Sequence, residues 1–198
     1  MITRAALLTL ISLLLLTFPC TAQTQEIAVE DWESGDTLSG GSGYWVGDWI
    51  VSGGGQYLIF GTEVPYEGSY CVRFNNAIAL ERTVDMTAIS AADPVISFAY
   101  KGKRQDATGY VEIWDGAWQR IFSWTANDVE DFVWYTASIS ISTFNWNRPD
   151  FKIRIGYDSA KRTYVYFDLI KVYDVLPATP TPDPTETPVP TDTPVPTD

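Results

Sequence analysis

The strongest constraint on the fold is a two-residue alternation of apolar and polar side chains. Residues 151–157 read Phe-Lys-Ile-Arg-Ile-Gly-Tyr, and similar alternation runs through 96–101 and 137–141. Successive side chains of a β-strand point to opposite faces of its sheet, so this period gives each strand one apolar and one polar face. Such strands are typical of antiparallel sheets with one face in water.

A hairpin signal strengthens the β prediction. Residues 110–114 run into Asp115-Gly116, a dipeptide typical of tight hairpin turns, and 117–124 returns. Roughly ten short strands separated by polar turns predict an all-β fold, a two-sheet antiparallel β-sandwich of the jelly-roll type.

The N-terminal end differs in composition from this β-rich middle. Residues 1–22 combine a positive start at Arg4, an uncharged apolar stretch and a small residue at Ala22, as a secretory signal peptide does. The apolar stretch is shorter than the roughly 20 residues that span a bilayer. We therefore expect a secreted, extracellular or cell-surface protein without a transmembrane segment in the mature chain. A lipid anchor on Cys20 is the alternative.

The C-terminal end, residues 177–198, contains eight prolines and seven threonines with four acids and no basic residue. Proline prevents helix formation and removes ladder donors, and the like charges repel one another. This composition predicts a disordered, extended Thr-Pro-rich linker. The predicted β-sandwich domain therefore covers residues 23–176.

Composition excludes several functions. The chain has no histidine, which removes Ser-His-Asp triads and imidazole metal sites. The net charge of −12 would repel a phosphate backbone, so we expect no nucleic acid partner. Cys71 is the one cysteine of the predicted mature chain and fits a small apolar strand residue. The acids of Glu30-Asp31-Trp32-Glu33 lack the spacing of a glycosidase pair, and we predict no enzymatic activity.

Three segments in order carry a family resemblance. They are Glu30-Asp31-Trp32-Glu33-Ser34-Gly35, Tyr66-Glu67-Gly68-Ser69-Tyr70 and the closing Tyr164-Val165-Tyr166-Phe167-Asp168-Leu169-Ile170. This succession, over nearly all of 28–174, resembles the MAM-like, concanavalin-type jelly-roll modules of bacterial extracellular proteins. The resemblance implies a non-catalytic role in adhesion, assembly or glycan binding. Leu169 departs from the pattern, which has a second acid there, and the cysteines of eukaryotic MAM domains are absent.

Asp168 is the candidate metal ligand. With strict alternation it shares a face with Tyr164, Tyr166, Ile170 and Val172, where a lone buried carboxylate is costly unless paired. One interpretation is a salt bridge or a hydrogen-bonded cap. The other is a structural Ca²⁺ site, because oxygen ligands suit that ion. The resemblance suggests that Asp31 or Glu33 meets Asp168.

Aromatic side chains supply candidates for core and ligand binding. Four tryptophans at strand positions are expected in the core: Trp32, Trp49, Trp124 and Trp134. A two-residue turn at Asp115-Gly116 pairs Glu112 with Gln119 and places four residues on one face: Tyr110, Glu112, Trp114 and Gln119. Two rings around two polar groups suit a glycan surface.

Trp45 and Trp146, each in a predicted loop, are further candidate sugar platforms. For these loop rings, and for the strand face, the alternative is packing onto the sandwich. Two functions follow. The first is a secreted, non-catalytic module for adhesion or surface display, with an extracellular glycan or surface protein as partner. The alternative is a carbohydrate-binding module that the linker tethers to an enzyme.

Overall fold

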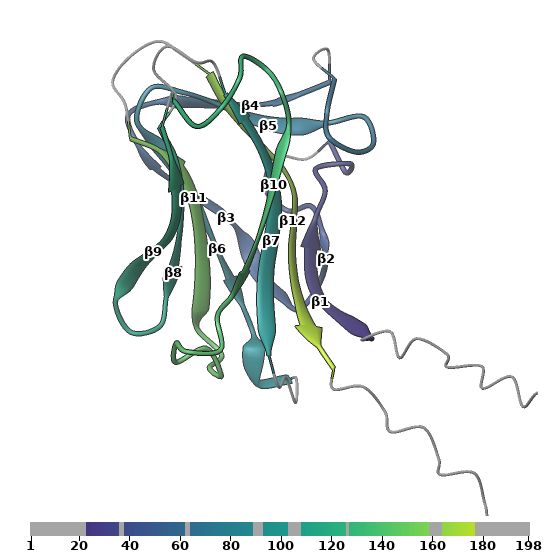
Figure 1. The fold of residues 1–198 in the computed structure, drawn as a ribbon. Helices are drawn as coiled ribbons and strands as arrows, with labels where there is room; N and C mark the ends of the chain where they lie inside the picture. Colours follow the sequence, from purple (N-terminus) through teal and green to yellow (C-terminus); the bar gives the residue numbers. More distant parts are fainter. Residues whose placement is uncertain are drawn as a thin grey trace, which may run out of the picture. The chain divides into compact units, whose positions relative to one another are not determined.

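The computed structural model describes residues 23–35, 38–61, 64–88, 93–102, 108–125, 127–158 and 164–176. The predicted signal peptide and the predicted linker lie outside these residues. The described residues form two antiparallel sheets packed face to face (Figure 1). This two-layer β-sandwich confirms the predicted fold class. In the part of the chain that the structure describes, no helix is both long and apolar enough to cross a bilayer.

Sheet A contains both terminal strands of the domain. Its order is β10 (Tyr135–Ser140), β7 (Pro94–Gly102), β12 (Tyr164–Val175), β1 (Thr24–Glu30) and β2 (Ser42–Gly43). The first part of β12 also pairs with β5 (Cys71–Asn75), which pairs with β4 (Gln56–Phe60). The long β12 therefore joins two groups of strands into one sheet.

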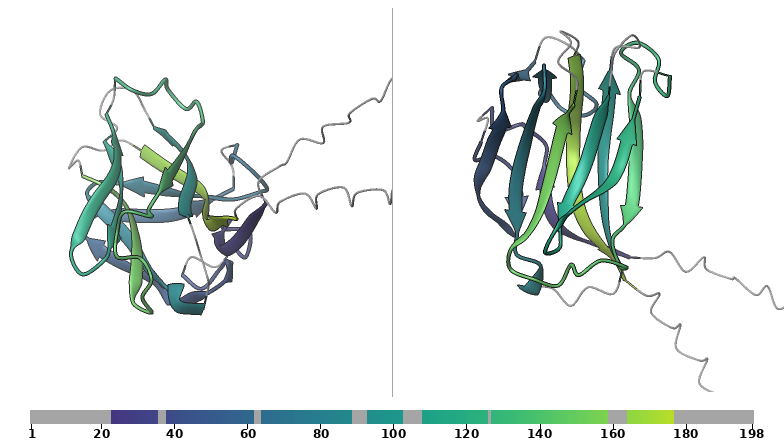
Figure 2. Two further views of the ribbon diagram at one scale, coloured as in Figure 1. Left: turned by 60° about the horizontal axis from the view of Figure 1, so that its bottom comes forward. Right: turned by 90° about the vertical axis from the view of Figure 1, so that its left-hand side faces the viewer.

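Sheet B is the opposite layer. Its order is β3 (Trp45–Gly53), β6 (Ile78–Val84), β11 (Phe151–Tyr157), β8 (Gly109–Trp114) and β9 (Trp118–Trp124). A 3-10 turn, η1 (Met86–Ala88), follows β6. Figure 2 shows the two layers from further directions.

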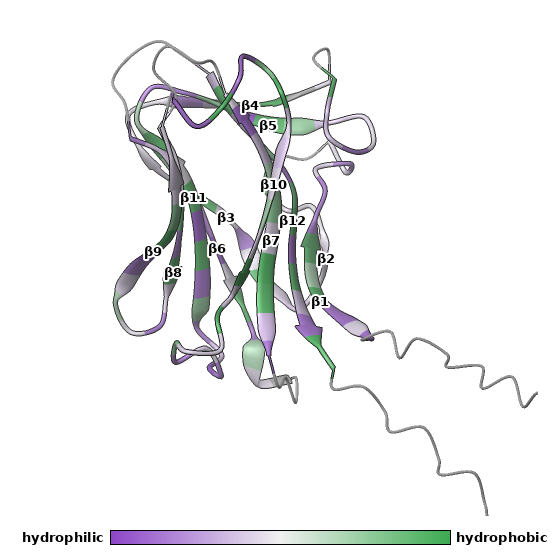
Figure 3. Ribbon diagram, in the orientation of Figure 1, coloured by the Kyte–Doolittle hydropathy of each residue, from purple (hydrophilic) through white to green (hydrophobic). Residues whose placement is uncertain are grey.

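The core lies between the sheets and follows the predicted alternation. In β11, Phe151, Ile153 and Ile155 are fully buried, whereas Lys152 and Arg154, which alternate with them, are partly exposed. Figure 3 shows how hydrophobic and hydrophilic residues are distributed over the strands. Cys71 is buried at the start of β5, as expected for a small apolar strand residue. Three predicted core tryptophans are buried with the aliphatic residues: Trp32, Trp49 and Trp124.

Trp134 was expected in this core, and that expectation is wrong. It is only partly buried, and its indole nitrogen donates to the carbonyl oxygen of Val64 at 3.0 Å. Its ring lies 4.5 Å from the Lys101 ammonium and packs edge-on against Tyr66. Trp134 precedes β10 instead of lying within a strand, so strand alternation does not set its direction.

The face predicted for Asp168 needs a second correction. The pairing of β12 with β7 shifts between Asp168 and Lys171, which is a β-bulge, and Leu169 has a φ of 47°. A bulge adds one residue and exchanges the two faces of the strand beyond it. Phe167 and Ile170 therefore both belong to the core, while Asp168 does not share the face of Ile170 and Val172.

Candidate functional site

The outer face of sheet B carries part of the predicted ligand-binding set. Val111 and Ile113 point into the core, as the alternation of β8 predicted. Tyr110, Glu112 and Trp114 alternate with them and therefore point outward. The predicted common face of these three residues is confirmed.

The predicted hairpin register is wrong by one residue. Trp114 pairs with Trp118 and Glu112 with Arg120, so the turn contains three residues, Asp115 to Ala117. Gly116 has a φ of 121°, which an Asp-Gly sequence can supply to a three-residue turn as well as to a two-residue one. Because Gln119 pairs with Ile113, it points to the other side of the sheet, away from the proposed aromatic face.

Tyr110 is covered instead of exposed. The side chain is 7% exposed. Its ring lies so close over Gly156 of β11 that a Cβ there would overlap it, and the Arg120 guanidinium stacks 4.2 Å from the ring centre. Burial, with a smaller contribution from the charges of Asp158 and Glu112, raises the pKa of the Tyr110 hydroxyl to about 12, and the nearby arginines oppose the rise. Tyr110 therefore supports Arg120 and is not a platform for a ligand.

Trp118 takes the place that the prediction gave to Tyr110. Trp114 and Trp118 are both half-buried, with ring centres 5.6 Å apart and planes at 61°. The Arg154 guanidinium lies 3.5 Å from the Trp118 ring centre. The sequence placed Trp118 after the hairpin turn but left its facing open, because the facing depends on the length of that turn and on whether a bulge follows it.

Ion pairs continue from these tryptophans across sheet B. Glu112 accepts from Arg120 at 2.9 Å and from Arg154 at 3.4 Å, and Arg154 also binds Glu81 at 2.7 Å. The four charged side chains come from β6, β11, β8 and β9, which neighbour one another in the sheet. We call Trp114, Trp118, Glu112, Arg120, Arg154 and Glu81 the sheet B face.

The two tryptophans predicted in loops are held by packing, and Trp45 is the first residue of strand β3, so its predicted loop position is wrong. The Trp45 indole nitrogen donates to Val29 at 3.0 Å, and its ring lies 5.4 Å from Trp49. Trp146 is partly buried and packs against the core. Both observations agree with the packing alternative, so the sheet B face is the better candidate for ligand binding.

Two of the three acids proposed as metal ligands, Asp168 and Glu33, accept hydrogen bonds from one short segment, residues 66–70. Asp168 is fully buried and accepts main-chain hydrogen bonds from Tyr66 at 2.9 Å and Glu67 at 3.2 Å. Glu33 accepts from the amides of Ser69 and Tyr70. Asp31 instead accepts from the nearby Glu33 amide at 3.1 Å.

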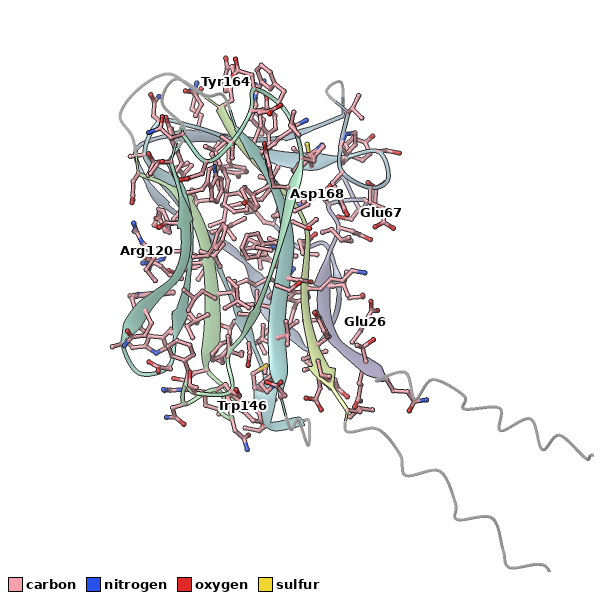
Figure 4. The ribbon with its side chains drawn as sticks, in the orientation of Figure 1. Glu26, Glu67, Arg120, Trp146, Tyr164 and Asp168 are labelled. Carbon is pink, nitrogen blue, oxygen red and sulfur yellow. The ribbon has the colours of Figure 1, made fainter. Side chains whose placement is uncertain are left out.

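Figure 4 shows Asp168 and Glu67 next to each other, on the side of the sandwich away from Arg120. The pKa of Asp168 is raised to about 6, mainly by burial. The charge of Glu33 contributes to this rise, and three main-chain donors oppose it. The main-chain hydrogen bonds to both carboxylates agree with the interpretation of Asp168 as a hydrogen-bonded cap. Among the described residues, no three Asp, Glu or Cys side chains gather as a metal site. The calcium site stays a prediction.

The two antiparallel sheets define the class of protein as an all-β sandwich, and solved structures share this fold. The CBM22-1 xylan-binding domain of Paenibacillus barcinonensis Xyn10C gives a TM-score of 0.54 at 13% identity, over 80% of this chain and 99% of that domain. TmCBM61, solved with β-1,4-galactotriose, gives a TM-score of 0.54 at 14% identity, over 73% of this chain and 94% of that module. The CBM22-1–CBM22-2 tandem domain of Xyn10C gives a TM-score of 0.55 at 14% identity, over 82% of this chain and 48% of the tandem domain.

The TM-scores above 0.5 show a shared fold, and at 13–14% identity the likeness is one of fold alone. No protein-family model matches the chain. No curated protein matches it in sequence. The resemblance to MAM-like modules therefore stays a prediction, while its β-sandwich fold is confirmed.

Proposed function

We propose that this protein is a secreted, non-catalytic module that binds a glycan on the sheet B face. The observation that carries the proposal is the half-buried Trp114–Trp118 pair beside a row of ion-paired carboxylates and guanidinium groups. Aromatic rings stack on the apolar faces of sugar rings, and the charged groups offer donors and acceptors to hydroxyls.

The ion pairs hold these groups in place before a ligand arrives. Glu112 is fixed by Arg120 and Arg154, and Arg120 also binds Asp158 at 2.7 Å. A side chain that is already ordered loses less conformational freedom on binding. Pre-ordering of this kind favours a defined ligand over general surface adhesion.

The fold comparisons support the carbohydrate-binding alternative more than the adhesion hypothesis. Two of the structures that share the fold are a xylan-binding domain and a module solved with β-1,4-galactotriose. A role in adhesion would still be served by the same face if the glycan belongs to a cell surface. The sugar itself is a matter for experiment.

The test is a glycan-array screen of the whole protein, followed by calorimetry with the best ligand and with xylohexaose. We expect Trp114→Ala and Trp118→Ala each to weaken binding about tenfold or more, because truncating a central aromatic anchor typically costs over 1 kcal/mol. Tyr44→Ala is the matched control, since Tyr44 is 44% exposed and outside the sheet B face.

Binding that survives both tryptophan substitutions would exclude the sheet B face as the site. Absence of binding to every glycan would contradict the proposed function itself. The melting temperature of each variant separates loss of the ligand site from loss of the fold.

A further inference from the structure

The outer face of sheet A carries a groove that the proposed function does not use. It measures about 220 Å³ and runs over β10, β7 and β12. In the strand register, Ser97 lies between Ser138 and Lys171, and Ala99 lies opposite Thr136. Residues directly opposite one another share a face, so small and hydroxyl-bearing side chains form the floor.

Tyr66 forms the wall of this groove. It is 44% exposed and packs edge-on against Trp134, with ring centres 6.0 Å apart. Its amide nitrogen is held by the buried Asp168 carboxylate at 2.9 Å. An exposed ring on a fixed main chain is a suitable stacking surface for a ligand.

The support behind the wall is rigid. Lys101 is 3% exposed, and its ammonium donates to the carbonyl oxygen of Val64 at 2.9 Å. The same oxygen accepts from the Trp134 indole at 3.0 Å. The Lys101 ammonium also lies 4.7 Å from the ring centre of Tyr166. A buried cation and two aromatic rings thus fix residues 64–66 against sheet A.

The charge of the groove indicates the kind of ligand. Lys171 is the one charged side chain among the described residues that line it. Its ammonium pairs with Glu26 at 3.3 Å, but Glu26 is 59% exposed. An exposed pair of this kind is weak, so a carboxylate on a ligand can replace Glu26.

We propose that this groove is a second glycan subsite, which takes a sugar ring bearing a carboxylate, that is, a uronate. The ring stacks on Tyr66, its hydroxyls bond to Ser97, Thr136 and Ser138, and its carboxylate faces Lys171. The subsite lies on the opposite layer from the sheet B face, so a second chain can be bound while the first site is occupied.

The experiment is a backbone amide NMR titration of the whole protein with trigalacturonate and, separately, with xylohexaose, at about 0.15 M salt to limit repulsion by the net charge. We expect trigalacturonate to shift the amides of Ser97, Thr136 and Ser138. Tyr66→Ala, and Ser138→Phe, which fills the floor, should each weaken this binding about tenfold or more.

Lys171→Met should weaken the binding of trigalacturonate about two- to fivefold, which corresponds to the free energy of an exposed ion pair, and leave the binding of xylohexaose unchanged. Equal loss for both sugars would contradict the uronate assignment. Trp114→Ala is the control, because it removes the sheet B face and leaves the groove intact. If no amide of sheet A shifts, the inference of a uronate subsite is wrong, whatever happens on sheet B. If only amides of sheet A shift, the uronate subsite stands and the proposed site on sheet B is contradicted.

Discussion

Asp168 is an acid in an environment that an acidic side chain does not prefer. The carboxylate is fully buried, and its hydrogen bonds come from the main chain of Tyr66, Glu67 and Leu169. Burial raises its pKa to about 6. Asp168 holds the main chain of Tyr66 by a hydrogen bond, and Tyr66 forms the wall of the groove on sheet A. The charge state of Asp168 therefore affects the groove.

The raised pKa predicts a pH dependence of stability. The folded state holds the Asp168 proton up to about pH 6, whereas the unfolded chain releases it near the ordinary value of 3.8. Between these values the folded state binds more protons, so stability falls as pH rises through this window, by on the order of 2 kcal/mol. The measurement is the free energy of unfolding against pH in EDTA, with Asp168→Asn as the matched variant. A difference between the two proteins that does not change with pH would contradict the assignment.

Calcium is the second variable in that experiment. If Ca²⁺ binds to Glu33 and Asp168, excess Ca²⁺ should raise the melting temperature more at pH 7 than at pH 5, because Asp168, with its pKa of about 6, is charged at the higher pH. Asp168→Asn should remove the effect. Identical curves in EDTA and in Ca²⁺ would refute the calcium prediction and leave the pH dependence in place.

At the scale of elements, one buried ion pair joins the two sheets. Glu30 at the end of β1 accepts from the Arg82 guanidinium of β6 at 2.9 Å, and the side chains are 0% and 6% exposed. Glu30 also accepts from the Trp49 indole at 2.9 Å. Burial raises the pKa of Glu30 and lowers that of Arg82, and their mutual attraction opposes both shifts.

Breaking this pair should be strongly destabilising. Arg82→Ala leaves the Glu30 carboxylate buried without its cation, for which we expect a loss of about 3–5 kcal/mol in the free energy of unfolding. Glu30→Gln should cost less, because glutamine still accepts from Trp49. Urea denaturation of both variants measures the difference. A loss below about 1 kcal/mol for Arg82→Ala would show that the pair contributes little.

The sequence predicted the strands better than their connections. Alternation in 151–157 and 110–114 gave the correct faces, because burial of one sheet face is a local periodic property. The turn after Trp114 was predicted one residue too short, since Asp-Gly is compatible with both lengths. The bulge at Asp168–Leu169 depends on amides about a hundred residues away, which no local pattern contains.

For the whole molecule, the alternation of apolar and polar residues predicted two packed sheets. It did not predict the order of the strands within each sheet. Trp118 and Arg154 are 36 positions apart and meet because β8 lies between β9 and β11 in the sheet. From sequence the candidate site could be placed on β8 alone, whereas four of its six side chains come from the neighbouring strands β9, β11 and β6.

The pairing of the two terminal strands has a mechanical consequence. Thr24 lies opposite Val175, and the Leu176 amide donates to Gln23 at 2.9 Å, so the domain begins and ends at one point of sheet A. A pull between these ends loads the β1–β12 hydrogen bonds one after another, as in unzipping. Handles at residues 23 and 164 would instead load the same ladder in shear. Force spectroscopy should record a clearly lower unfolding force for the first geometry, and equal forces would show that another contact bears the tension.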